Sequence, residues 1–385
     1  MSNADFDLAI CGAGPTGCAL ALLLAQYSPH PERIALIGRL PANNQHSSDP
    51  RAIALNYGSR QLLQAIDGWP QHSAPIDTVH VSQQGYLGCT LIEAADMQVP
   101  ILGAVVSYDA LIQQLHEAVA RSPIHFIQTD AAVTPQAGQT VHIQLPNTDT
   151  PLITAQLAVQ SDGHRPVGVS RDYQQHAVLA TLRASHPIKG RAYERFTTTG
   201  PFALLPHPQS DHHYALVWCL APHQAEHYRS LPKTEFEQAC ERTFGPWLGC
   251  LQLASERFVF PLSLHAGAHQ VATRIVAIGN AAQTMHPVAG QGLNLGLRDV
   301  AQLAQALRSW LIEPHQDPTA ALHHFTQLRR TDRWLTIGIT DTLARIFTTP
   351  NNLIHHALGL GLFGLGMADA PRRSFTRHLL HGLRS

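Results

Sequence analysis

Charged side chains are scarce in this chain, and neither sign is in excess. Of its 385 residues, 26 are Lys or Arg and 27 are Asp or Glu, which leaves a formal net charge of −1. A surface that binds nucleic acid needs clustered positive charge to hold the phosphate backbone. The composition therefore argues against a nucleic-acid partner.

Cysteine is also sparse, and its spacing is irregular. The six cysteines form no CxxC pair. This argues against a disulfide framework and favours a reducing compartment, in which the thiols stay unlinked and mostly buried. The cysteines are Cys11, Cys18, Cys89, Cys219, Cys240 and Cys250.

Long apolar runs are missing as well. No stretch reaches the roughly 18 apolar residues that a membrane-spanning helix needs. The N-terminal sequence MSNADFDLAICGAG has no basic segment before its apolar run, so we expect no signal peptide. These absences predict a cytoplasmic protein.

Histidine is abundant, with 25 residues, but it shows no metal-ligand spacing. No HExxH motif occurs, and adjacent pairs such as His212 and His213 do not share a helix face. We expect no metal site and interpret most of these histidines as surface residues.

The first glycine-rich turn follows a short apolar strand. Residues 6–11 (FDLAIC) predict the strand, GAGPTG follows, and an alanine-rich apolar helix comes next. In this context Gly12 allows a tight turn, Gly14 lets a pyrophosphate approach the backbone, and Gly17 lets the helix pack on the strand. The free N–H groups at the helix start would receive the phosphate charge. The pattern favours a dinucleotide site over a turn that serves packing alone, and it does not say which dinucleotide.

The expected ribose contact is missing after the second strand, at residues 33–37. An acidic residue usually ends this strand and holds the adenosine ribose, but Gly38 and Arg39 stand here. Arg51 then follows in DPRAIAL; its planar cation suits a phosphate or a flavin edge, although a solvated loop arginine is the simpler interpretation. Further on, an apolar strand at 157–160 leads into a turn at Asp162 and Gly163.

A second glycine-rich loop lies in the segment RIVAIGNAAQTMHPVAGQGLNLGLRD. Residues 274–278 predict a buried strand, which ends at Gly279 and at Asn280, whose polar side chain could reach a ribityl hydroxyl. The loop from His286 to Asn294 then opens a helix expected from about 293 to 311. Backbone N–H groups at that helix start could hold the negative charge of a reduced isoalloxazine. A second loop of this kind makes packing alone a poor explanation.

Four segments have now been described: the first glycine-rich turn, the segment around Arg51, the turn at Asp162 and the second glycine-rich loop. In this order and at these separations, they resemble the group A flavoprotein monooxygenases, the family of 4-hydroxybenzoate hydroxylase. The stretch GNAAQTMHPVAGQGLNLGLRD is similar to the ubiquinone-biosynthesis branch, with Asn280 where most of the family has Asp. Residues 191–196, 200–206 and 216–219 match the same branch and would be strands of a substrate-facing sheet. The departures, at Gly38 and at Ser161 before the Asp-Gly turn, concern the adenosine contacts.

The resemblance implies an α/β fold, in which a Rossmann-like FAD-binding domain is interleaved with a smaller substrate domain built on a β-sheet, followed by C-terminal helices. We expect the FAD-binding domain at 1–80, 97–180 and 265–310, the substrate domain at 81–96 and 181–264, and the C-terminal helical region at 311–385.

The resemblance also implies an activity: hydroxylation of the aromatic ring of a polyprenylated (methoxy)phenol in ubiquinone biosynthesis. FAD stays bound, NADPH or NADH is a transient reductant, and O2 reacts through a flavin C4a-hydroperoxide. The protein must exclude water and hold the ring, so no conventional general base is required. His286 and Pro287 are expected near the flavin face, although His286 could equally be a structural loop histidine. The residues implied to bind FAD are Gly12, Gly14, Gly17, Arg51, Asp162, Gly279, Asn280, Gly290, Gly292, Leu293 and Asn294.

The C-terminal part has three open interpretations. Residues 320–347 predict a helix with His323, Arg329, Arg330 and Arg333 on exposed faces. An apolar, glycine-rich piece at 353–367 and a basic tail follow. They could contact the inner membrane peripherally, pack on the protein's own core, or bind other enzymes of the ubiquinone pathway.

Three rival functions stay open. The chain could hydroxylate another ring position or another phenol. It could be a flavin-dependent isoprenoid reductase or epoxidase, which would not couple NADPH oxidation to phenol hydroxylation. It could also be a FAD-fold scaffold that binds a prenylated partner without catalysis.

Overall fold

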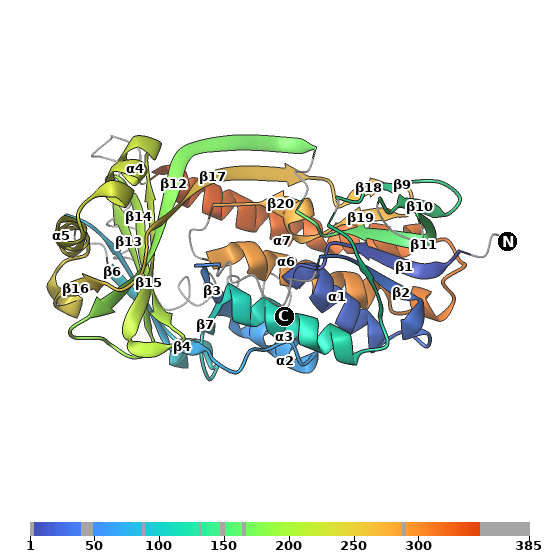
Figure 1. The fold of residues 1–385 in the computed structure, drawn as a ribbon, viewed down its shortest axis with the longest axis horizontal. Coiled ribbons are helices and arrows are strands. Elements are labelled where there is room, and N and C mark those ends of the chain that lie inside the picture. The colour runs from blue at the N-terminus through green and yellow to red at the C-terminus, as the bar shows by residue number, and fades with distance from the viewer. Residues whose placement is uncertain are drawn as a thin grey trace.

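The computed structural model describes residues 4–39, 49–86, 89–130, 132–146, 151–163, 167–286 and 290–346. These residues form an α/β fold with three sheets (Figure 1). Among them, no helix is both long and apolar enough to cross a membrane.

The eight-stranded sheet carries the first glycine turn. Its parallel centre pairs β1 (Phe6–Cys11) with β2 (Ile34–Gly38) and with β11 (Leu152–Gln160), and β19 (Ile275–Ala277) pairs with β11. The predicted strand at 6–11 is therefore confirmed, and those at 33–37 and 274–278 are shifted or shortened at their ends. The remaining strands are β8 (His125–Gln128), β9 (Pro135–Gln136), β10 (Val141–Gln144) and β18 (Gln270–Ala272).

Three helices cover one face of this sheet: α1 (Pro15–Ala25), α3 (Tyr108–Arg121) and α6 (Gln291–Leu307) (Figure 1). Their apolar side chains form one core with β1 and β2. The predicted helix at 293–311 is split, because α6 ends at Leu307 and a 3-10 turn, η6 (Trp310–Ile312), follows.

The nine-stranded sheet has its own core, against α4 (Pro222–Ser230) and α5 (Lys233–Phe244). Successive side chains along its central strands point to opposite faces of the sheet, so every second side chain points at these helices. Tyr214, Leu216 and Trp218 all belong to that core. The strands are β5 (Thr78–Gln83), β6 (Cys89–Glu93), β12 (Gly168–Ala184), β13 (Arg191–Thr197), β14 (Gly200–His207), β15 (Ser210–Leu220), β16 (Leu251–Leu253), β17 (Phe258–Gly267) and β20 (Gln283–Thr284).

A small third sheet, β3 (Ala52–Asn56), β7 (Gly103–Ser107) and β4 (Ala74–Ile76), lies beside α2 (Tyr57–Ala65). The expected domain boundaries at 80, 180 and 265 fall inside β5, β12 and β17. Strands thus run across these positions, and the division into interleaved domains stays a prediction.

Two long strands of the nine-stranded sheet, β12 and β17, pair with each other and extend toward the α6 and α7 region (Figure 1). A bulge interrupts their register between Asp172 and Gln175, where Gln174 takes a left-handed backbone with φ of 52°. Here β12 has two extra residues, Tyr173 and Gln174, and such a bulge redirects the side chains beside it.

The long helix α7 (Thr319–Ile346) packs on α6. His323 and Arg330 are exposed, as predicted. The expectation that Arg329 and Arg333 face solvent is wrong, because they are only 1% and 3% exposed. Arg329 is buried because it pairs with Asp299 of α6 and with Asp332 one turn along its own helix.

Candidate functional site

The first glycine turn packs tightly on one side and is open on the other. A Cβ at Gly17 would clash with the carbonyl oxygen of Gly12, and one at Gly12 would lie 2.5 Å from the amide nitrogen of Asp162. Gly12 also has a φ of 121°, which other residues rarely adopt. A Cβ at Gly14 would meet nothing within 4 Å. Gly14 is the N-cap of α1 and makes no side-chain cap, so the helix start has room for a ligand.

Gly38 lies against this turn, which explains the missing acidic residue. A Cβ there would lie 2.6 Å from the amide nitrogen of Ala13. The amide of Gly12 also donates to the carbonyl of Ile37, at 2.8 Å, so the end of β2 and the turn are in direct contact. An Asp or Glu at 38 would require the backbone to move. Residues 40–48, which follow, lie outside the described part of the chain.

The turn at Asp162-Gly163 and the turn at Gly279-Asn280 lie next to each other, beside the first glycine turn. A Cβ at Gly163 would be 3.9 Å from the Cβ of Asn280, and both Asp162 and Asn280 are exposed. Gly279 belongs to a 3-10 turn, η4 (Gly279–Ala281), and a Cβ there would lie 2.9 Å from Oγ1 of Thr16 in α1. Segments far apart in the sequence therefore converge at the start of α1.

The start of α6 completes this cluster. Gly290, the N-cap, has a φ of 61°, and Gly292 has open space where a Cβ would be. The side chain of Leu293 is partly buried and packs against the hydrophobic core. Pro287 lies outside the described residues.

Asn294 is fully engaged by the protein itself. Its Oδ1 accepts from the amide of Asn56 at 2.9 Å and from Oγ of Ser59 at 2.8 Å. Its Nδ2 donates to the carbonyls of Ala54, at 3.0 Å, and Gly290, at 2.7 Å. The side chain uses both donors and both acceptor positions, so it holds the start of α6 in place rather than reaching a ligand.

Arg51 lies at the start of β3 and is held on two sides. Its Nε donates to Asp49 at 2.8 Å, and its guanidinium stacks on the ring of Tyr108 at 4.3 Å. The carboxylate of Asp49 raises the pKa of Arg51, so the cation persists. Its side chain is 45% exposed, and it could still contact an anionic ligand on its open side.

His286 is a buried, neutral side chain. It is 0% exposed, its Nε2 lies 2.9 Å from Oε1 of Gln175, and its ring meets the edge of Tyr173 at 5.0 Å. Burial lowers the pKa of His286 to about 4, and Asp341 offsets this only partly. The imidazole is therefore uncharged at neutral pH, which argues against a role as a general acid. The bulge in β12 places Tyr173 and Gln175 beside it.

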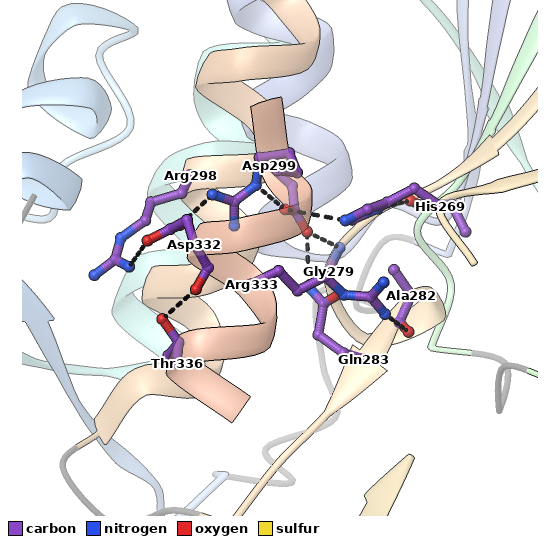
Figure 2. A network of polar contacts seen from close by, with 11 residues as sticks. His269, Gly279, Ala282, Gln283, Arg298, Asp299, Asp332, Arg333 and Thr336 are labelled. Carbon is purple, nitrogen blue, oxygen red and sulfur yellow. Dashed lines mark hydrogen bonds and ion pairs between the residues drawn. The ribbon is translucent and has the colours of Figure 1, made fainter. Parts of the chain in front are cut away.

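A buried network behind the second loop was not anticipated from the sequence (Figure 2). Asp299 of α6 accepts from the amide of Gly279 at 3.1 Å, from Nε2 of Gln283 at 2.7 Å and from Nε of Arg329 at 2.7 Å. Arg333 donates to the carbonyl of Ala282 at 2.7 Å. The spacing of charged and hydroxyl side chains along α7 was the available signal, because 329, 332, 333 and 336 share one helix face.

Comparison with known proteins agrees with this geometry. Residues 5–317 match the family described as FAD binding domain. The ubiquinone hydroxylase UbiL of Rhodospirillum rubrum is 30% identical, over 98% of this chain and 90% of that protein. The 3-demethoxyubiquinol 3-hydroxylase of Escherichia coli is 26% identical, over 99% of this chain and 100% of that protein.

Among solved structures, p-nitrophenol 4-monooxygenase PnpA from Pseudomonas putida superimposes with a TM-score of 0.74, covering 100% of both chains at 15% identity. That likeness shows a shared fold. Three features of the structure fit FAD: an open helix start at Gly14, open space at Gly292, and the exposed polar side chains of Asp162 and Asn280. The chain therefore belongs to the FAD binding domain family and is an FAD-dependent monooxygenase.

Proposed function

We propose that this monooxygenase hydroxylates the aromatic ring of a polyprenylated phenol in ubiquinone biosynthesis, with NADPH or NADH as reductant and O2 as co-substrate. The substrate class rests on the relatives UbiL and 3-demethoxyubiquinol 3-hydroxylase, which align along almost the whole chain. The observation that carries the proposal is that the segment leading into α6 packs on the start of α1: a Cβ at Gly279 would lie 2.9 Å from Oγ1 of Thr16, and one at Gly296 would lie 3.1 Å from the same atom.

Each part of the site has a distinct binding role in this proposal. Gly12, Gly14 and Gly17 shape the turn where N–H groups of α1 would hold the pyrophosphate. Asp162 and Asn280 present exposed polar groups that would bind ribityl hydroxyls.

The other predicted residues would lie around the flavin ring. The backbone of 290–294 would face the ring, and Arg51 would provide a cation at the edge of the ring. Gly279 would allow the tight turn of η4, which precedes this loop in the sequence. FAD, when bound, supplies the redox chemistry and the activation of oxygen.

The face of the nine-stranded sheet opposite α4 and α5 suits an apolar ring. Ala203 and Val217 pair across β14 and β15, and Leu179 pairs with Val217 across β12. Because paired residues share a face, these small and apolar side chains lie together, away from the Trp218 side. Such a surface can exclude water and position a greasy phenol.

His286 would shape the site rather than transfer protons. It is neutral and forms a hydrogen bond with Gln175, so it can hold the first residue of the loop that leads into α6 in position. Pro287 is proposed to lie beside it, next to the flavin.

The test begins with the protein reconstituted with FAD. We expect a bound-flavin spectrum, and NADPH consumption that rises when a prenylated methoxyphenol is added. Mass spectrometry should then show a product that has gained one oxygen atom, and NMR of the product would give the ring position. Flavin that binds but is never bleached by NADPH would indicate a scaffold, and NADPH oxidation without an oxygenated product would indicate a reductase.

The membrane proposal concerns residues 353–385, which lie outside the described residues. Their apolar and basic composition supports peripheral contact with a membrane that holds the prenylated substrate. Liposome binding of the full chain can be compared with that of a chain ending at Pro350. Equal binding would refute the membrane contact and leave the catalytic proposal standing.

A further inference from the structure

The network behind the second loop contains more positive than negative charge. Arg298, Asp299, Arg329, Asp332 and Arg333 lie together on α6 and α7, and each side chain is at most 10% exposed (Figure 2). Three guanidinium groups face two carboxylates, so one positive charge is left over. His269 is next to Asp299 but adds no charge at neutral pH, because burial lowers its pKa to about 4.

Arg333 makes no ion pair within 4 Å among the described residues, although the carboxylate of Asp299 attracts it over a longer distance. Its side chain donates to the carbonyl oxygen of Ala282 at 2.7 Å and lies over the ring of Trp334 at 5.6 Å. Its Nε is buried and has no hydrogen-bond partner in the described structure. Arg329, in contrast, pairs with both Asp299 and Asp332. A guanidinium stays protonated even when buried, so the unpaired charge cannot be lost by titration.

The charge cluster lies directly behind the two segments that are proposed to hold the ribityl chain and the flavin ring. Arg333 contacts Ala282, and the amide of Ala282 donates to the carbonyl of Gly279 at 3.0 Å. On the other side, Arg298 donates to Oε1 of Gln291, the first residue of α6, at 3.3 Å. The cluster thus contacts both η4, whose Asn280 is proposed to bind the ribityl chain, and the start of α6, which is proposed to face the flavin ring.

We propose that Arg333 stabilises the anionic, reduced state of FAD and so raises its midpoint potential. The inference rests on the flavin site of the proposed function. A hydride from the nicotinamide brings two electrons and one proton to the neutral flavin, which leaves one negative charge. In a buried region of low dielectric, a cation without an ion-pair partner favours the negative charge of the reduced flavin even when it does not touch the flavin. Arg333 acts through the field of the cluster, so it is a positioning residue and not a catalytic one.

The test compares Arg333→Met with Arg330→Met, the exposed neighbour on the same helix. Midpoint potentials of the bound flavin are measured spectroscopically against reference dyes, without turnover. We expect Arg333→Met to weaken binding of reduced relative to oxidised FAD about tenfold, which for a two-electron couple lowers the potential by about 30 mV. Arg330→Met should leave it unchanged, and Arg333→Lys should restore most of the loss because it keeps the charge.

A second variant tests the same charge in the opposite direction. Asp332→Asn removes a negative charge from the cluster, so the potential should rise, and this arm remains informative if Arg333→Met fails to fold. Equal potentials in the wild type and in Arg333→Met would overturn the inference while leaving the flavin site intact. A fall in Arg333→Lys as large as in Arg333→Met would also overturn it, since shape and not charge would then matter. A wild-type chain that takes up no FAD would overturn the proposed function and this inference together.

Discussion

Replacing Asn294 with Ala should lower both the stability of the fold and the affinity for FAD. The side chain makes four hydrogen bonds, to Asn56, Ser59, Ala54 and Gly290, and it is buried. At about 1 kcal/mol net for each bond, the substitution should cost about 4 kcal/mol of unfolding free energy. Folded domains are stable by about 5–15 kcal/mol, so the variant should still fold but unfold at a clearly lower urea concentration.

The effect on FAD follows from the bond to Gly290. That bond holds the N-cap of α6, and without it the backbone must be ordered when FAD binds. Ordering one residue costs about 1–2 kcal/mol, so the dissociation constant should rise about 5- to 30-fold. Urea unfolding of the apoprotein and fluorescence titration with FAD measure the two effects separately.

Asn280→Ala is the matched control, because Asn280 is exposed and lies at the proposed ribityl contact. We expect weaker FAD binding with an unfolding free energy within about 0.5 kcal/mol of the wild type. An Asn294→Ala chain that unfolds at the wild-type urea concentration would refute the reasoning. So would one that binds FAD as tightly as the wild type, because the anchoring of Gly290 would then be irrelevant to the site.

Three further predictions test other parts of the site. Gly14→Ala should keep the wild-type unfolding midpoint but lose FAD affinity, whereas Gly17→Ala should be destabilised, because its Cβ would clash with a backbone carbonyl. His286→Gln should reduce the loss of stability in acid. The pKa of His286 in the folded protein is about 4, below the ordinary 6.5, so the neutral imidazole favours the folded state. This contribution to the unfolding free energy is complete above pH 6.5 and is lost as the pH falls toward 4. Asp299→Asn should cost about 3–5 kcal/mol of unfolding free energy, because it removes one of the two carboxylates that pair with the buried Arg329 and leaves more positive charge uncompensated in the cluster.

Each of these has a clear contrary outcome. Tight FAD binding by Gly14→Ala would mean that the phosphate does not approach that backbone. For His286, urea midpoints are measured from pH 4 to 8. If the midpoint falls equally with decreasing pH in His286→Gln and in the wild type, His286 does not resist protonation in the folded protein. For Asp299, the exposed Asp211→Asn is the control, and equal stability of the two variants would remove the argument for the buried pair.

The strands and turns around the proposed cofactor site were predictable from the sequence, because a glycine in a short motif indicates a position where a side chain does not fit. Where Gly12 and Gly17 occur, a side chain would collide with backbone, so the pattern GxGxxG reports a real packing requirement. Gly290 was predicted from the glycine-rich loop before α6, and it has a left-handed backbone at the N-cap of that helix. The role of Asn294 could not be predicted in the same way, because its partners Asn56 and Ser59 lie more than 200 residues away in the sequence.

The buried arginines show why the rest of the site was missed. Arginine is almost always exposed unless it is paired, so a sequence pattern places Arg329 and Arg333 at the surface by default. Their burial depends on Asp299 and on the carbonyl of Ala282, and no local rule connects these residues. The family match ends at residue 317, yet α7 begins at Thr319 and contacts the turn that would hold the flavin. The proposed cofactor site therefore extends to the helix beyond the matched region, which supplies charged side chains that contact Asp299 and Ala282.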